Sequence, residues 1–244
     1  MKRKRLITRR QALVTGLSSL GAALMLPGCT KPLPPTYGSI LRMGDNLTYI
    51  AHRALLPGQS LAREYRDADI SSFPATGTTD PSKLNEDYAK LLANSFDDYK
   101  LEVEGQVSRP GSYSLADLMK LDRRTQITKH TCEEGWTAIG EWTGVPLGAL
   151  LQHAGIMPSA KFIIFHTFDD FFDSIDLMDA FHPQTLIAYG MNGKTLPLQH
   201  GAPVRLRVET QIGYKSIKYL RKIEVSDKFV DVGEDTGWAW YTGI

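Results

Sequence analysis

The chain has 244 residues, of which 42% are hydrophobic and 23% charged, and its formal net charge is +1. Six of the 28 basic residues and none of the 27 acidic residues lie within the first 28 positions, so the remainder holds 22 basic against 27 acidic residues, a net charge of −5. This balance gives no electrostatic support for binding nucleic acid and is typical of a well-packed acidic domain.

Residues 1–28 are predicted to be an export signal. Basic residues precede an apolar stretch, residues 12–26, which is short for a membrane span and is interrupted by Gly and Ser. Arg9 and Arg10 stand just ahead of this stretch, as in the bacterial twin-arginine route, which moves proteins that have already folded. We therefore expect a periplasmic protein exported by that route.

Cys29 ends the sequence Leu-Pro-Gly-Cys, which resembles a lipobox, the site where bacterial lipoproteins are cleaved and lipidated. Proline is atypical in a lipobox, so two outcomes stay open: a lipid anchor at Cys29, or simple cleavage nearby. Residues 29–58 contain KPLPP and show little periodicity. We expect them to form a tether that leads into a domain at residues 59–244.

The domain is predicted to mix short strands and helices. Residues 62–82 are polar and rich in turn residues, which indicates a loop that covers another part of the molecule. Helices are expected at 83–94, after the capping box that begins at Ser114, at 145–155 and at 174–181. Strands are expected at 99–107, 125–132, 161–168, 203–209 and 217–225, with a tight hairpin turn at 191–194. These elements predict an α+β domain of mixed β-sheets with inserted helices.

Cys132, in the sequence KHTCEEGW at residues 129–136, is the only cysteine after Cys29. Burial as a small apolar side chain is the simplest explanation, but His130, Glu133 and Glu134 are costly to bury beside it. A catalytic cysteine is less well supported, because no nucleophile signature surrounds it and neighbouring carboxylates raise a thiol pKa. A zinc site needs several closely spaced ligands, and the sequence has no CxxC, HxxxH or HExxH. A soft metal centre completed by a cofactor would need only this one sulfur.

Such a cofactor is usually anionic, and the last third of the chain has the basic residues to bind it. Six of them lie within eighteen positions: Arg205, Arg207, Lys215, Lys218, Arg221 and Lys222. Alternating basic residues also occur on the solvated face of a strand, which is the simpler explanation for Arg221 and Lys222. Gly201 and Gly213, beside the others, would let the backbone approach a ligand closely.

Three segments together carry a family resemblance: KHTCEEGWTAIGEWTGVPLGALL, FHPQTLIAYGMNGKTLPLQHGAPVRLRV and IGYKSIKYLRKIEV. In this order they resemble the molybdopterin-binding oxidoreductase domain of the sulfite oxidase superfamily, over most of residues 60–244. They are most similar to its stand-alone bacterial branch, which includes the periplasmic catalytic subunits of protein-methionine-sulfoxide reductases. The resemblance implies a sulfite oxidase-like molybdopterin-binding fold and an enzyme that uses molybdenum–molybdopterin, a pyranopterin dithiolene cofactor.

The resemblance also implies roles for individual residues. Cys132 would be the protein ligand to molybdenum and hence the catalytic residue. The pterin and its phosphate would be held by Thr167, His200, Arg205, Ser216, Ile217 and Lys218. Two positions depart from the reductase branch: His200 stands where that branch has Asn and sulfite oxidases have His, and Thr76 stands where a cofactor-binding Asn is expected. Candidates for the substrate pocket, chosen for their proximity to these motifs in the sequence, are Glu134, Trp136, His182 and Tyr214.

The chemistry implied by the resemblance is oxygen-atom transfer, with reduction of an S-oxide or N-oxide favoured over oxidation of sulfite. A cofactor-free thiol enzyme of the envelope and a binding lipoprotein are the alternatives from other classes. The sequence has no CxxCH and no cysteines for an iron–sulfur cluster, so we expect a separate haem protein as redox partner, either a membrane-embedded b-type cytochrome or a c-type cytochrome. The chain ends soon after the last motif, so we expect a monomer without an appended dimerisation or haem domain.

Overall fold

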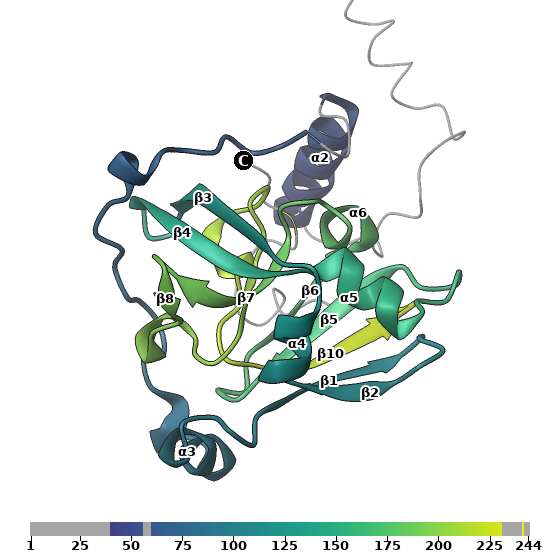
Figure 1. The fold of residues 1–244 in the computed structure, drawn as a ribbon. Helices are drawn as coiled ribbons and strands as arrows, with labels where there is room; N and C mark the ends of the chain where they lie inside the picture. Colours follow the sequence, from purple (N-terminus) through teal and green to yellow (C-terminus); the bar gives the residue numbers. More distant parts are fainter. Residues whose placement is uncertain (1–39, 56–59, 231–240, 242–244) are drawn as a thin grey trace, which may run out of the picture. The chain divides into compact units, whose positions relative to one another are not determined.

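The computed structural model describes residues 40–55, 60–230 and 241. Its strands form two sheets (Figure 1). The first sheet has the order β2 (Gly111–Ser114), β1 (Lys100–Gly105), β10 (Leu220–Ser226), β5 (Phe162–Thr167) and β6 (Phe172–Asp176). Only β1 and β10 run parallel, and the other neighbours in this sheet are antiparallel.

The second sheet is antiparallel throughout. It has the order β3 (Arg124–Thr131), β4 (Thr137–Pro146), β7 (Leu186–Met191) and β8 (Lys194–Thr195), and β9 (Arg205–Arg207) pairs with β7 beside them. In the hairpin of β3 and β4, Thr131 lies opposite Thr137. Residues 132–136 therefore form the turn of this hairpin, and Cys132 is the first residue after β3.

Among the described helices, the last three lie between these strands in sequence, as expected, and the first two precede β1. The helices are α2 (Ile40–Leu55), α3 (Glu86–Ala93), α4 (Leu115–Lys120), α5 (Leu147–Ala154) and α6 (Leu177–Ala180), with 3₁₀ turns at Asp67–Asp69, Pro81–Lys83, Leu198–His200 and Gly213–Lys215. The predicted capping box is present, since the Asp117 N–H donates to Ser114 Oγ at 3.1 Å. Gly155 ends α5 at φ +73°, a left-handed conformation that favours glycine. No helix among the described residues has both the length and the apolar character that a membrane crossing requires.

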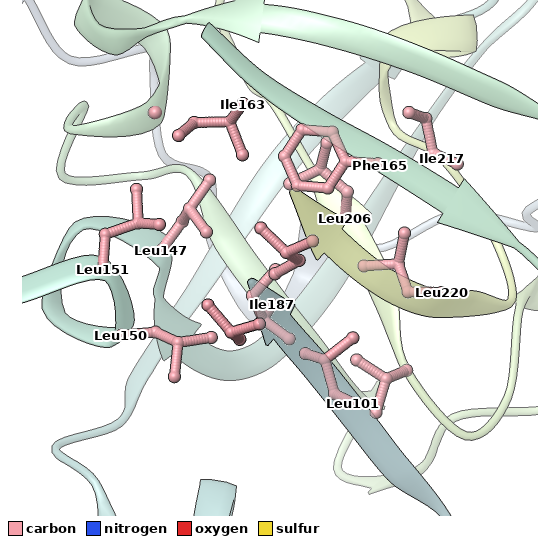
Figure 2. Close-up of a cluster of buried hydrophobic side chains, with 14 of the residues drawn as sticks. Leu101, Leu147, Leu150, Leu151, Ile163, Phe165, Ile187, Leu206, Ile217 and Leu220 are labelled. Atoms are coloured by element: carbon pink, nitrogen blue, oxygen red, sulfur yellow. The ribbon is translucent and has the colours of Figure 1, made fainter. Parts of the chain in front are cut away.

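Both sheets and α5 contribute to the main hydrophobic core. Leu101, Phe165 and Ile223 come from the first sheet, and Ile187 and Leu206 come from the second. Figure 2 shows Leu147, Leu150 and Leu151 of α5 in one cluster with Leu101, Phe165, Ile187 and Leu206. Because one core joins the two sheets, the ends of their strands are held in a fixed relation to one another, and the functional residues lie at those ends.

Several element boundaries differ from the sequence-based expectation. Strands β4 and β6 were not predicted, and the helix expected at 174–181 is reduced to α6 because Ser174–Asp176 complete β6. The strand expected at 203–209 is only three residues long, and β10 begins at Leu220 rather than at 217. Pairing with another strand decides these boundaries, and the local sequence pattern does not report that pairing.

The segment predicted as a tether contains α2, which the sequence analysis did not expect. Arg53 Nη2 of this helix lies 2.7 Å from Asp179 Oδ2 and 3.1 Å from Asp176 Oδ1. Tyr49 also donates its hydroxyl to Asp176, at 2.9 Å. Both carboxylates are buried, so Arg53 compensates charge that the rest of the domain leaves inside. The signal and lipobox residues, 1–29, lie outside the described residues.

A second buried ion pair anchors the segment that precedes β10. Lys215 Nζ lies 2.7 Å from Asp173 Oδ1 and donates to the Ser174 carbonyl at 3.0 Å, and both members of the pair are at most 1% exposed. A surface pair of equal length, 2.7 Å between Lys222 Nζ and Glu104 Oε1, lies on the neighbouring strands.

We expect Lys215→Met to destabilise the protein by about 3–5 kcal/mol, because it leaves the Asp173 carboxylate buried without its cation. Lys222→Met is the matched control and should cost less than about 1 kcal/mol, because its partner stays solvated. Urea unfolding of both variants, followed by circular dichroism, measures the difference. Equal midpoints for the two variants would contradict this account of the buried pair.

Candidate active site

A pocket of about 490 Å³ lies where the two sheets and the covering loop meet. Residues 60–83 run along β3 and β4, with the Tyr65 N–H donating to the Ile127 carbonyl and the Ser71 N–H to the Ile139 carbonyl, at 2.9 and 3.0 Å. This loop then places Phe73 and Thr76 over the pocket. The covering loop expected from the sequence is therefore confirmed.

Cys132 lines this pocket and is 4% exposed. Its position is fixed by the hairpin turn, since its N–H donates to the Trp136 carbonyl at 2.9 Å and its carbonyl accepts from the Gly135 N–H at 3.1 Å. Burial raises the pKa of the thiol, and the nearby Glu133 carboxylate adds to this shift. Cys132 is thus not an activated nucleophile, and no hydrogen bond joins its Sγ to a histidine in the described part of the chain.

A metal site built from several protein ligands is also not supported. No group of three or more His, Cys, Asp or Glu side chains within residues 40–55, 60–230 and 241 is arranged to hold a metal ion. A metal bound at Cys132 would therefore take its remaining ligands from elsewhere. The Glu134 N–H, 3.5 Å from Sγ, points a donor at the sulfur and favours its thiolate form.

The floor of the pocket carries two cations, Arg205 and Lys218, that make no ion pair with any described residue. Arg205 is 4% exposed, and its guanidinium donates to the carbonyls of His200, at 2.9 Å, and Ser216. Lys218 Nζ donates to the carbonyls of Thr76, at 2.8 Å, and Thr78. Burial lowers the pKa of Lys218 to about 8, and the charge of Arg205 adds to this shift. Such a site favours an anion, because a second partner would offset the cost of burying both charges.

His200 is buried between the same two cations. Burial lowers its pKa to about 4, and Arg205 and Lys218 contribute further. The imidazole is therefore neutral at pH 7 and lies edge-on to the Phe73 ring, with 5.5 Å between the ring centroids. A neutral ring at this place adds no charge to the floor and can act as donor or acceptor.

The mouth of the pocket has the opposite charge. Glu133 and Glu134 follow Cys132, and Asp169 and Asp170 form the turn between β5 and β6, so that carboxylates from two loops line the same pocket. Trp136 lies among them and donates from Nε1 to Glu134 at 3.0 Å. The pocket is therefore cationic at its floor and acidic at its entrance.

Most of the predicted cofactor residues meet in this pocket. Thr76, Cys132, His200, Arg205, Ser216, Ile217 and Lys218 all line it. Thr167 does not, since it is buried behind the wall with its hydroxyl 2.6 Å from Asp169 Oδ1 and 2.7 Å from the Phe171 carbonyl. It orients the turn that carries Asp169, so any contact of Thr167 with a cofactor stays a prediction.

The candidates for the substrate pocket divide in the same way. Glu134, Trp136 and Tyr214 line the pocket. His182 does not: its Nδ1 accepts from the Gln184 N–H at 3.2 Å, so its Nε2 donates to the Ser60 carbonyl at 3.0 Å. This histidine holds the start of the covering loop, and its proximity in sequence to the motifs was misleading.

The six clustered basic residues differ in their exposure and in their partners. Arg205 and Lys218 face the pocket, whereas Lys215 and Arg207 are buried in pairs with Asp173 and Glu209. Arg221 is exposed and Lys222 pairs with Glu104 across the sheet, as the solvated-strand explanation expected.

The two glycines allow close contacts within the protein. A Cβ at Gly213 would lie 2.5 Å from His130 Nε2, and one at Gly201, which has φ +104°, would lie 2.9 Å from Lys218 Cβ. Gly213 also lines the pocket, and a close approach of either glycine to a ligand stays a prediction.

Sequence reasoning missed Phe73, Asp169 and Asp170. Phe73 makes edge-on contacts with Trp136 and Trp142, at centroid distances of 5.8 and 5.3 Å, and so forms an aromatic wall beside the cysteine. An aromatic residue within an otherwise polar loop was the available signal for Phe73. The two aspartates lie in a hairpin turn, where acidic residues are common, and carried no signal.

The comparisons with known proteins agree with this geometry. Residues 89–231 match the oxidoreductase molybdopterin binding domain. The chain is also 33% identical, over 96% of its length and 87% of the relative, to a protein of Azospira oryzae named as a candidate protein-methionine-sulfoxide reductase subunit, YedZ1.

The chain belongs to the molybdopterin-binding oxidoreductase family. It is an oxidoreductase, and its cofactor is molybdenum–molybdopterin. Another relative, the protein-methionine-sulfoxide reductase catalytic subunit MsrP of Xanthomonas campestris, is 33% identical over 91% of this chain and 70% of its own. The predicted family is thereby confirmed, and a cofactor-free thiol enzyme or binding lipoprotein is excluded.

The fold has a solved counterpart in the crystal structure of the sulfane dehydrogenase SoxCD from Paracoccus pantotrophus. The TM-score is 0.54 at 26% identity, and the similarity covers 57% of this chain and 40% of that one. The predicted sulfite oxidase-like fold of mixed sheets with inserted helices is confirmed for this molybdopterin oxidoreductase.

The residues of the pocket fit the cofactor on their own chemistry. The phosphate of molybdopterin is a dianion, and the pocket offers it the buried Arg205 and the half-buried Lys218, neither of which makes an ion pair with a described carboxylate. Molybdenum is a soft metal in a dithiolene, and Cys132 offers one thiol with no competing ligand cluster.

Phosphate binding by the cofactor-free protein should weaken above pH 8. The pKa of Lys218 is lowered to about 8, so the ammonium loses its proton above that pH and the floor loses one of its two charges. The affinity for inorganic phosphate, measured by calorimetry between pH 7 and 9.5, should then fall by up to about tenfold per pH unit.

Lys218→Arg is the control, because a guanidinium keeps its charge over this range. Its phosphate affinity should stay nearly constant up to pH 9.5. Parallel losses in the wild-type protein and in Lys218→Arg would show that another group controls the pH dependence.

Proposed function

We propose that this protein reduces an uncharged S-oxide or N-oxide in the periplasm, with electrons supplied by a separate haem protein. For an S-oxide the balanced reaction is R₂SO + 2e⁻ + 2H⁺ → R₂S + H₂O. The names of the relatives support this proposal, because the Azospira and Xanthomonas proteins are both named for methionine-sulfoxide reduction and match most of this chain.

The charge of the pocket entrance is the observation that carries the direction of the reaction. Sulfite, the substrate of the alternative reaction, is an anion and would pass Glu133, Glu134, Asp169 and Asp170 to reach Cys132. Two like charges 4 Å apart repel by about 1 kcal/mol in bulk water and by more near a protein surface. An S-oxide or N-oxide has no net charge, so it enters without this cost.

In this proposal the residues around Cys132, the two cations and the aromatic side chains have different functions. The molybdenum cofactor, when bound, supplies two-electron oxygen-atom transfer. Cys132 holds the metal, and Arg205 and Lys218 orient the cofactor by its phosphate. Phe73 and Trp136 present apolar faces beside the sulfur, which suit the alkyl groups of an S-oxide and exclude bulk water.

The redox partner follows from what the sequence lacks. Two electrons must arrive one at a time from a haem, and the sequence contains only Cys29 and Cys132. A lipid at Cys29 would keep the domain near the membrane and raise its effective concentration for a membrane-embedded b-type cytochrome. We therefore favour that partner over a soluble c-type cytochrome.

The direction can be measured with the purified, molybdenum-loaded protein. We expect reduced viologen to be oxidised in the presence of dialkyl sulfoxides or amine N-oxides, and sulfite to reduce a dye slowly or not at all. The double variant Glu133→Gln/Glu134→Gln should lower the KM for sulfite, because it removes two negative charges from the entrance. Robust sulfite oxidation by the wild-type protein without any oxide reduction would overturn the proposed direction.

Cys132→Ser should keep the fold but lose oxide reduction by at least about a hundredfold, because a hydroxyl of similar size is a poor ligand for a soft metal. Cys29→Ser is the control, since it replaces the other cysteine and should leave the activity of the purified protein unchanged. Molybdenum content and activity are measured together. A molybdenum-loaded Cys132→Ser protein with wild-type activity would contradict the assigned role.

The export route is proposed from the sequence, since the signal residues lie outside the described part. Arg9→Lys/Arg10→Lys should block twin-arginine export and leave folded precursor in the cytoplasm. Replacing Lys2 and Lys4 by Arg, which keeps the charge of the signal, should not. Cell fractionation and immunoblotting measure both. Normal export of the double Lys variant would point to the general secretory route.

A further inference from the structure

His130 lies on the wall of the pocket, two residues before Cys132, and is 8% exposed. Its ring is held between aromatic neighbours, with centroid distances of 5.2 Å to Phe73 and 5.4 Å to Trp136. On its inner side, His130 Nδ1 lies 2.7 Å from Arg207 Nη1. The ring therefore has one edge toward the interior and one toward the pocket.

Arg207 cannot turn away from this contact. It is 1% exposed, its Nε and Nη2 donate to the two oxygens of Glu209 at 3.1 and 2.8 Å, and its guanidinium lies 4.3 Å from the centroid of the Trp142 ring. Glu209 is in turn held by Gln126, whose Nε2 donates to it at 3.1 Å. The guanidinium is thus fixed by three buried side chains.

This contact decides where the histidine carries its proton. A guanidinium has N–H donors and no acceptor, so Nδ1 of His130 must accept the hydrogen bond. A neutral imidazole that accepts at Nδ1 has its proton on Nε2. A second proton on Nδ1 would point at the N–H of Arg207.

The Nε2–H group is directed to the pocket side and has no acceptor among the described residues. Nε2 lies against Gly213, where an added Cβ would come within 2.5 Å of it, and Gly213 also lines the pocket. This nitrogen stays accessible to solvent, so water satisfies its N–H in the free pocket and a bound ligand would take the place of that water.

We propose that His130 is a hydrogen-bond donor to the ligand held beside Cys132, through an Nε2–H that the buried Arg207–Glu209 pair fixes in that tautomer. The acceptor is an oxygen, nitrogen or sulfur atom of either the molybdopterin group or the substrate oxide. Arg207 and Glu209 are positioning residues, since they act through His130. This inference depends on the cofactor family but not on the direction of oxygen transfer.

The tautomer can be observed directly in the wild-type protein. Long-range ¹H–¹⁵N NMR of histidine-labelled protein distinguishes the two tautomers, and loss of a signal in His130→Gln assigns the resonance. We expect the Nε2–H tautomer in both the cofactor-free protein and the molybdenum-loaded protein in its diamagnetic oxidised state. Arg207→Met should give a mixture of tautomers, whereas Arg221→Met, which removes an exposed arginine, should not. An Nδ1–H tautomer in the wild-type protein would overturn the proposal.

Two variants, studied as molybdenum-loaded enzymes, distinguish whether the acceptor belongs to the cofactor or to the substrate. His130→Leu removes the N–H donor, and His130→Gln keeps a side-chain N–H donor. If the cofactor is the acceptor, His130→Leu changes the resting Mo(V) EPR spectrum and lowers molybdenum occupancy roughly tenfold with an unchanged KM. If the substrate is the acceptor, the resting spectrum is unchanged and the KM for the oxide rises roughly tenfold. His130→Gln should recover part of either effect.

The Nε2–H chemical shift provides the variant-free measurement. It should move when the cofactor is loaded, or when oxide is added to the loaded protein. A shift that stays constant in all three states would overturn the proposal even if the variants fold poorly.

Discussion

Two cations, the buried Arg205 and the half-buried Lys218, donate their hydrogen bonds to backbone carbonyls and organise the active site. Lys218 joins residues 76 and 78 of the covering loop to the end of the first sheet, and Arg205 joins residues 200 and 216 across β9. The carbonyl dipoles solvate these charges in place of water, but they do not neutralise them. Holding these two unneutralised charges in the protein lowers the stability of the free domain, and a bound phosphate would remove that cost. The order of the covering loop and the affinity for the cofactor therefore have the same physical cause.

The predicted metal ligand and the predicted phosphate site come from different sheets. Cys132 is the first residue after β3 of the second sheet, whereas Lys218 lies two residues before β10 of the first. Their relation is set by the core in which Phe165 and Ile223 pack with Ile187 and Leu206. Substitutions in that core are thus expected to affect the geometry of the pocket, because packed interiors transmit small displacements.

Charge changes sign with depth in the pocket. The floor is cationic and selects the anionic cofactor, while Glu133, Glu134, Asp169 and Asp170 make the entrance acidic. Behind the wall, Arg207 is paired with Glu209, and one of its N–H groups serves to orient His130. Neighbouring basic residues of one short segment thus have different functions because their partners differ.

The sequence by itself determined the family and most of the residues that line the pocket, Cys132 among them, because these belong to local motifs whose residues lie close together wherever the motif folds. It also determined the helix cap at Ser114 and the end of α5 at Gly155, which depend on backbone preferences of a few adjacent residues. It did not find β4 or α2, because these are stabilised by a strand or by carboxylates far away in the chain. It also did not find β6, which pairs with the preceding strand β5. Only the tertiary structure decided which basic residues face the pocket, that His182 holds the covering loop, and that His130 presents an N–H beside Cys132. The physical reason is that charge, tautomer and accessibility are set by the partners of a side chain, and those partners lie up to 142 residues away in the sequence.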